Sequence, residues 1–270
     1  MTETKPSHSV DPQPIDQLRV QKISFDDVRQ SIAYGWSDFL QQPLLSGFFG
    51  AVYAFGGIFI LISLLYFEQI WMIIPVALGF PLIAPFVAAG LYEISRRIGL
   101  SEPYSSSDIF LIIRKQPGRE LGWMAFVVLF LFWIWIYQVR LLLAVFLGFR
   151  PFSSLEAFFD VVLGTAEGFL FIGIGTLVGS FLALVLFSLT VISMPLLLDK
   201  EIDFISAMLL SIRTVATNPG VMLAWGCIIA VLAIAAMLPL FLGLIVVLPV
   251  LGHTTWHLYK RAIVTIDANV

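Results

Sequence analysis

Charged side chains are scarce in this 270-residue chain, in which Asp, Glu, Lys and Arg together make up 12% of the residues. An average soluble protein has roughly 25%. Hydrophobic residues make up 59% of the chain, and its mean hydropathy is +0.96. This composition excludes an ordinary water-soluble domain, and we expect the lipid bilayer to be the solvent for most of the chain.

Cysteine and net positive charge are scarce as well. The single cysteine, Cys227, excludes an intrachain disulfide and a cysteine-based metal cage, and its apolar neighbours predict a small buried hydrophobic side chain. The formal net charge of -3 provides no basic field, so we expect no nucleic-acid partner. The first 40 residues lack the apolar core of a signal peptide, and no cleavable signal is expected.

Long apolar runs are abundant, and each is about as long as the roughly 20 residues that cross a bilayer. The six runs cover approximately residues 46–67, 70–92, 121–139, 169–198, 221–237 and 238–258. The first pair and the last pair are separated by very short junctions, which predict tight helical hairpins. The sequence therefore predicts an all-α, polytopic membrane protein with six transmembrane helices in three hairpins, over residues 25–262.

Basic residues are distributed unequally between the two sides of these runs. Arg140 and Arg150 fall on one side, and the other 13 of the 15 Lys and Arg fall on the side of the chain ends. Because basic loops stay in the cytoplasm, both termini are expected to be cytoplasmic. Residues 1–24 are expected to form a disordered cytoplasmic tail and residues 263–270 a second cytoplasmic tail.

An amide residue followed by proline precedes each odd-numbered run, at Gln42-Pro43, Gln116-Pro117 and Asn218-Pro219. Proline in the first helical turn loses no hydrogen bond, and the amide side chain can bond the free backbone donors there. Amphipathic stretches upstream predict helices on the cytoplasmic membrane surface. Each even-numbered run carries proline near its inner end. The pattern predicts three copies of one unit, at 25–98, 107–200 and 201–262, with coincidence as the alternative.

Small residues and two polar residues stand out inside the runs. Pairs four residues apart, such as Gly50 with Ala54 and Gly175 with Gly179, favour close helix packing. Gln138 and Arg140 interrupt the third run. Snorkelling of Arg140 to the outer interface is the simpler explanation, and an outer vestibule lined by both residues is the alternative.

Two histidines provide the candidate site, because His253 and His257 lie four residues apart on one helical face and could chelate one metal ion. Counting on from the prolines of the other even-numbered runs reaches Asp199 and Glu93. Packing around a pseudo-axis would bring the four side chains together as a polar or metal cluster. The alternative is that the histidines hydrogen-bond lipid or neighbouring helices. No cofactor is predicted, and a divalent metal ion stays open.

No catalytic motif is present in the sequence. Two imidazoles on successive turns cannot fill both axial positions of one haem, and the third histidine, His8, lies in the tail. A phosphate loop, a nucleophile elbow and a zinc-protease motif are absent too. We therefore expect no enzyme and no catalytic residue, but an accessory, assembly or structural membrane protein with a membrane-protein partner. The alternatives are a small-molecule transporter or channel, and a metal-handling protein that uses His253 and His257.

The sequence resembles an uncharacterised family of bacterial predicted integral membrane proteins, a domain of unknown function whose members are sometimes labelled cytochrome c oxidase subunit I-like. The resemblance is carried by residues 90–97 (GLYEISRR), 193–199 (SMPLLLD), Asn218-Pro219 and 248–261 (LPVLGHTTWHLYKR). It implies a multi-pass protein of the bacterial inner membrane without an established activity. The histidine count argues against the oxidase label.

Overall fold

The computed structural model describes residues 17–66, 87–101, 118–148 and 155–266, and most of them are helical. The labelled elements in chain order are β1 (Leu18–Val20), α1 (Phe25–Gln41), α2 (Pro43–Tyr66), α5 (Gly118–Leu142), the π-helix η2 (Leu143–Leu147), α6 (Leu155–Gly164), α7 (Ala166–Thr190), α8 (Ser193–Asp199), α9 (Phe204–Thr217), α10 (Pro219–Met237), α11 (Leu244–Ala262) and β2 (Ile263–Thr265). Residues 87–100 form a further helix.

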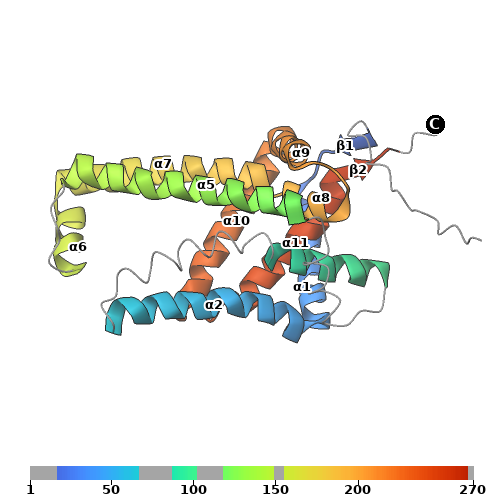
Figure 1. The fold of residues 1–270 in the computed structure, drawn as a ribbon, viewed down its shortest axis with the longest axis horizontal. Helices are drawn as coiled ribbons and strands as arrows, with labels where there is room; N and C mark the ends of the chain where they lie inside the picture. Colours follow the sequence, from blue (N-terminus) through green and yellow to red (C-terminus); the bar gives the residue numbers. More distant parts are fainter. Residues whose placement is uncertain (1–16, 67–86, 102–117, 149–154, 267–270) are drawn as a thin grey trace, which may run out of the picture.

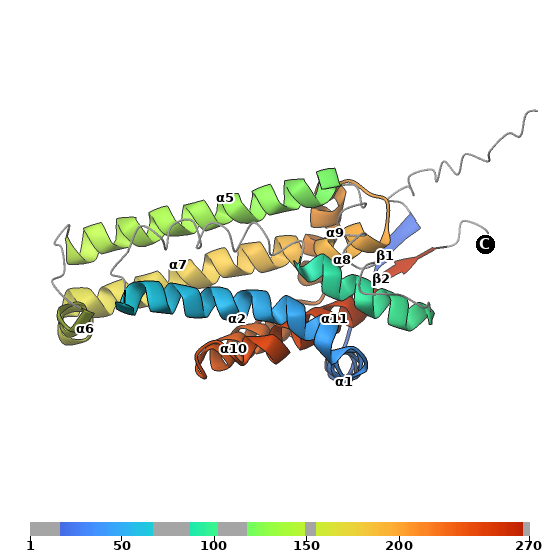
Figure 2. The same ribbon diagram turned by 60° about the horizontal axis from the view of Figure 1, so that its bottom comes forward.

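Helices α2, α5 and α7 run roughly along the molecule, and α10 and α11 are steeply inclined to them (Figure 1). Helices α5 and α7 lie side by side on one side, and α2, α10 and α11 lie on the other (Figure 2). Helices α1, α8 and α9 and the two strands meet at the end where α11 finishes, while α6 lies at the opposite end. The largest buried cluster lies at the end with α8, α9 and the strands, and includes Tyr92, Trp225, Trp256 and Tyr259.

Four of the described helical stretches are long and apolar enough to cross a membrane. They are Pro43–Ser63, Glu120–Leu147, Ala166–Asp199 and Pro219–Met237. They confirm an all-helical membrane protein in outline, while the six spans and three hairpins remain a prediction. Much of the second run, residues 70–86, lies outside the described residues. Helix α11 covers the sixth run but is less apolar than the other four, because its second half carries His253, His257 and Lys260.

Two of the three expected corners are described, and they have the same backbone conformation. Gln42, between α1 and α2, has φ -136° and ψ 59°, and Asn218, between α9 and α10, has φ -127° and ψ 51°. Each of the two corners joins a shorter helix to an apolar span, and the three-copy repeat stays a prediction. The third corner, Gln116-Pro117, lies outside the described residues. At Asn218 the expected side-chain cap is wrong, because the side-chain oxygen instead accepts a hydrogen bond from the backbone N–H of Ile23, outside α10.

Part of the expected N-terminal tail is ordered. Leu18–Val20 pairs antiparallel with Ile263–Thr265, with Arg19 opposite Val264. The side-chain oxygen of Asn218 accepts a hydrogen bond from the backbone N–H of Ile23 at 2.9 Å. Disorder through residue 24 is therefore a wrong expectation for residues 18–24, because backbone pairing across the two chain ends supplies hydrogen bonds that composition does not reveal.

Exposure also differs from expectation in one span. Cys227 in α10 is exposed rather than buried, so this small side chain lies on the outer surface of the molecule.

The expected close packing of Gly50 and Ala54 is confirmed. A Cβ atom on Gly50 would lie 2.6 Å from the carbonyl oxygen of Leu244 in α11, and Ala54 is fully buried beside the same helix.

Candidate functional site

The second half of α11 presents one polar side chain per turn to its neighbours. The first is His253, which is fully buried. Its Nε2 lies 2.9 Å from the hydroxyl of Ser46 in α2, and its Nδ1 lies 2.8 Å from the hydroxyl of Ser95 in the helix of residues 87–100. A neutral imidazole has one donor and one acceptor nitrogen, so the two serines complete the hydrogen bonding of the ring. His253 thus joins three helices.

His257, one turn later, contacts α1. Its Nε2 lies 2.7 Å from a carboxylate oxygen of Asp38, which is buried. The ring of Tyr34 lies against the imidazole, with 5.3 Å between the ring centroids. Between these two contacts the helices approach closely, because a Cβ atom on Gly35 would lie 2.6 Å from the backbone nitrogen of Thr254.

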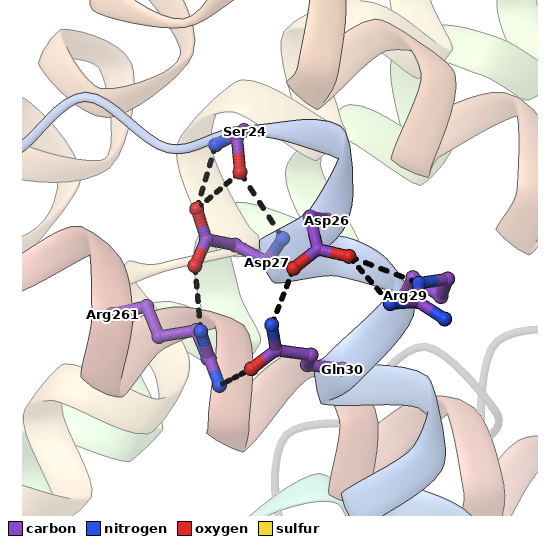
Figure 3. A network of polar contacts seen from close by, with 6 residues as sticks. All are labelled: Ser24, Asp26, Asp27, Arg29, Gln30 and Arg261. Carbon is purple, nitrogen blue, oxygen red and sulfur yellow. Dashed lines mark hydrogen bonds and ion pairs between the residues drawn. The ribbon is translucent and has the colours of Figure 1, made fainter.

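Arg261, a further turn along, contacts the start of α1 (Figure 3). Its guanidinium donates to Asp27 at 2.6 Å and to the side-chain oxygen of Gln30 at 2.8 Å. Asp27 also belongs to a capping box, in which its carboxylate accepts from the backbone N–H of Ser24 at 2.8 Å. The bonds from Ser24, followed by the charge and hydrogen bond of Arg261, hold the pKa of Asp27 below its usual value.

The remaining two candidate residues have other partners. Asp199, at the end of α8, accepts a hydrogen bond from the hydroxyl of Tyr259 at 2.7 Å and lies 3.2 Å from the amino group of Lys260. Burial and then the charge of Asp199 raise the pKa of Tyr259, so the phenol stays protonated and donates. Glu93 is buried and pairs with Arg96 and Arg97 of its own helix, at 2.7 and 2.6 Å.

The structure therefore places the four predicted residues at one end of the molecule with a different set of partners for each. His253 bonds two serines, His257 bonds Asp38, Asp199 bonds Tyr259 and Glu93 binds two arginines. Within the described residues, no three His, Cys, Asp or Glu side chains are arranged to hold a metal ion. A metal ion bound by His253 and His257 would have to displace these bonds. The hydrogen bonds of His253, His257 and Asp199 hold neighbouring helices together.

The sequence alone does not predict the partners of these residues. Asp27, Gly35 and Asp38 of α1 contact α11, and the buried Ser31 lies between them at the same helical spacing. Their spacing of three to four residues matches the spacing of His253, His257 and Arg261. This stripe was a detectable signal for a buried polar contact. Ser46 and Ser95 gave no such signal, because they lie 207 and 158 residues from His253 in sequence.

Comparison with known proteins gives one match. No curated protein and no solved structure matches the chain. Residues 73–199 match the model of a family described as "Predicted integral membrane protein (DUF2189)". This family is the uncharacterised membrane-protein family that the sequence resembles. Residues 73–199, somewhat less than half of the chain, are thus similar to the DUF2189 family of predicted integral membrane proteins, in agreement with the four apolar helical stretches.

Proposed function

We propose that this protein has a non-enzymatic accessory, assembly or structural role within the bacterial inner membrane. The proposal rests on the hydrogen-bond partners of the polar side chains around α11. His253, His257, Asp199 and Glu93 each bond other protein groups. Their hydrogen-bonding capacity is used to hold α1, α2 and α8 in place, and a structural role needs no further chemistry from them.

The surface of α5 supports a role that involves another membrane protein. Only 6% of its most apolar window is buried within the molecule. Phe126 and Phe130 are exposed on it, with their rings stacked at 6.4 Å between centroids. Helices in lipid associate through close packing of such surfaces. We therefore propose that a neighbouring membrane protein packs against α5.

The pairing of β1 with β2 supports termini on one side of the membrane. A two-stranded sheet leaves backbone groups unpaired at its edges, and such groups are not tolerated in hydrocarbon. Leu18 and Thr265 lie opposite each other in this sheet. The chain must then cross the membrane an even number of times between them. With the basic residues counted above, we propose that both ends are cytoplasmic.

A small-molecule transporter or channel is the second candidate function. Among the four described spans, only Glu120–Leu147 carries a charged side chain more than one turn from its ends, Arg140, and that residue is exposed. Coupled transporters commonly place ionisable groups inside the bundle. The described spans therefore support transport less well than a structural role.

The test is extraction of the full chain from its native membranes into polymer-bounded lipid discs. The proposal predicts discs with a membrane-protein partner at fixed stoichiometry, which the change Phe126→Leu with Phe130→Leu releases while keeping the span apolar. The matched control is Val231→Ala with Leu232→Ala on the exposed face of α10, which should retain the partner. A chain that is alone in its discs and that carries solute into vesicles would instead establish the transporter.

A further inference from the structure

A groove lies between α5 and α7, in the half of these helices nearer to α6. Its volume is about 520 Å³, within the roughly 300–1,000 Å³ of small-molecule sites. Trp135, Gln138 and Leu142 line it from α5, and Gly175, Thr176 and Ser180 line it from α7. Most of the other lining side chains are aliphatic or aromatic.

Glycine keeps the groove open. A Cβ atom on Gly175 would have Leu142 as its nearest neighbour, at 3.8 Å, and one on Gly179 would lie 3.2 Å from the ring of Trp135. Neither glycine has backbone of α5 within 4 Å of that position. The two glycines therefore pack against side chains of α5, tightly at Gly179 and at ordinary van der Waals distance at Gly175.

Three uncharged polar groups in the lining have no hydrogen-bond partner among the described residues. They are the amide of Gln138 and the hydroxyls of Thr176 and Ser180. Most other threonines of the described helices behave differently, since Thr165, Thr190, Thr214, Thr254 and Thr255 each donate to the carbonyl oxygen four residues earlier. Polar groups without partners are costly in hydrocarbon. A ligand with several hydrogen-bond acceptors in its head group would satisfy the three donors.

Depth in the membrane restricts the ligand. The span Glu120–Leu147 has 28 residues and is about 42 Å long, whereas the hydrocarbon core is about 30 Å thick. If the span is centred in the core, Gln138 lies about 7 Å from the midplane and about 8 Å inside the outer edge. A charged head group is disfavoured at that depth, and the named lining residues carry no charge to pair with it. The ligand must therefore be neutral and must enter from the lipid.

We propose that the groove binds a long-chain lipid with an uncharged carbonyl head, held by hydrogen bonds from Gln138, Thr176 and Ser180. Its hydrocarbon chain lies along the apolar walls of α5 and α7. In an ester, the carbonyl oxygen accepts two hydrogen bonds, the neighbouring oxygen can accept a third, and the head donates none, which complements a lining whose three polar side chains can all donate. The inference is independent of the accessory role proposed above.

The test uses the purified full chain in phosphatidylcholine vesicles with photoreactive probes. The probes share one diazirine-bearing hydrocarbon chain and end in a methyl ester, an alcohol, a carboxylate or no polar group. We expect the ester to label peptides of α5 and α7 at the lowest concentration. Gln138→Leu should raise that concentration roughly 2- to 10-fold for the ester, as expected for one hydrogen bond, and leave the alkane probe unchanged.

A pair of matched variants tests the position of the ligand. Gly175→Leu fills the groove and should abolish labelling by the ester. Gly173→Leu adds the same side chain two residues away, where nothing lies within 4 Å, and should leave labelling intact. Equal elution and equal melting midpoints of the two variants show that both are folded.

Three results would overturn the proposal. Equal labelling by the alkane and the ester would remove the role of the polar groups, and equal labelling by the alcohol would remove the carbonyl head. Labelling spread evenly over α2, α5 and α10, or reduced equally by both glycine variants, would show ordinary surrounding lipid only.

Discussion

At the scale of single residues, the histidines of α11 act as connections between helices. His253 uses both ring nitrogens on serines from two other elements, and His257 uses Nε2 on Asp38. A buried group that loses its partner costs about 1–3 kcal/mol, more than the hydrogen bond itself contributes. Removing one partner from a hydrogen-bonded group around α11 should therefore destabilise the protein more than replacing all members of that group by apolar residues.

We predict that His253→Ala lowers the free energy of unfolding by about 2–4 kcal/mol, because it leaves two serine hydroxyls unpaired and opens a cavity. The combined change His253→Leu, Ser46→Ala and Ser95→Ala should cost clearly less than His253→Ala. Thermal unfolding in detergent measures both. If the triple variant is the less stable of the two, the hydrogen-bonded set is not what His253 provides.

The metal-handling alternative has its own test. Since His253 and His257 are bonded to protein groups, we predict that the zinc content of the purified protein is the same with and without the double change His253→Ala and His257→Ala. Elemental analysis of both proteins gives the answer. Zinc at one equivalent in the original protein and none in the double variant would establish a metal site.

The pH dependence of stability follows from Asp27. Its pKa is lowered in the folded protein, so its stabilising effect is present above the unfolded value, about 3.9, and is lost as the pH falls through the lower folded value. We predict that the thermal unfolding midpoint decreases as the pH is lowered below about 4. The decrease should be smaller in the Asp27→Asn variant. Asp160→Asn, at an exposed position of α6, is the control and should leave the profile unchanged. An unaltered profile for Asp27→Asn would contradict the stabilisation of the Asp27 carboxylate by Ser24 and Arg261.

At the scale of the elements, α11 is the helix around which the others are assembled. It contacts α1 through the polar stripe and α2 through Gly50 and Ala54. The sequence indicated α1, α2 and the corner between them at Gln42-Pro43, because proline and apolar periodicity act locally. The partners of α11 could not be predicted, because contacts across some 200 residues depend on how the spans pack.

We predict that Gly50→Ala destabilises the protein by about 1–3 kcal/mol, the usual range for overpacking. The added methyl group would lie 2.6 Å from the carbonyl oxygen of Leu244 and 2.7 Å from that of Ile245. Gly122→Ala in α5 is the matched control, because nothing lies within 4 Å of its Cβ position. That variant should be neutral or stabilised by up to about 1 kcal/mol. Equal melting midpoints for the two variants would refute the close approach of α2 and α11.

At the scale of the whole molecule, composition predicted a helical membrane protein, and the apolar helices and the family match agree. Hydropathy alone does not fix the number of spans, since α11 combines an apolar first half with a polar second half. The pairing of β1 with β2 could not be read from the sequence, because three-residue strands leave no periodic pattern. This pairing is nevertheless what relates the two chain ends.

The most direct test of the account is the sidedness of the two ends, measured with a membrane-impermeant thiol reagent on intact and permeabilised cells. In a Cys227→Ser background, single cysteines are placed by Arg19→Cys at an exposed position of β1, Thr265→Cys and Asp160→Cys. We predict that the cysteines at 19 and 265 react only after permeabilisation, whereas the cysteine at 160 reacts in intact cells. Reaction of one end in intact cells and of the other only after permeabilisation would contradict an even number of crossings and the paired strands together.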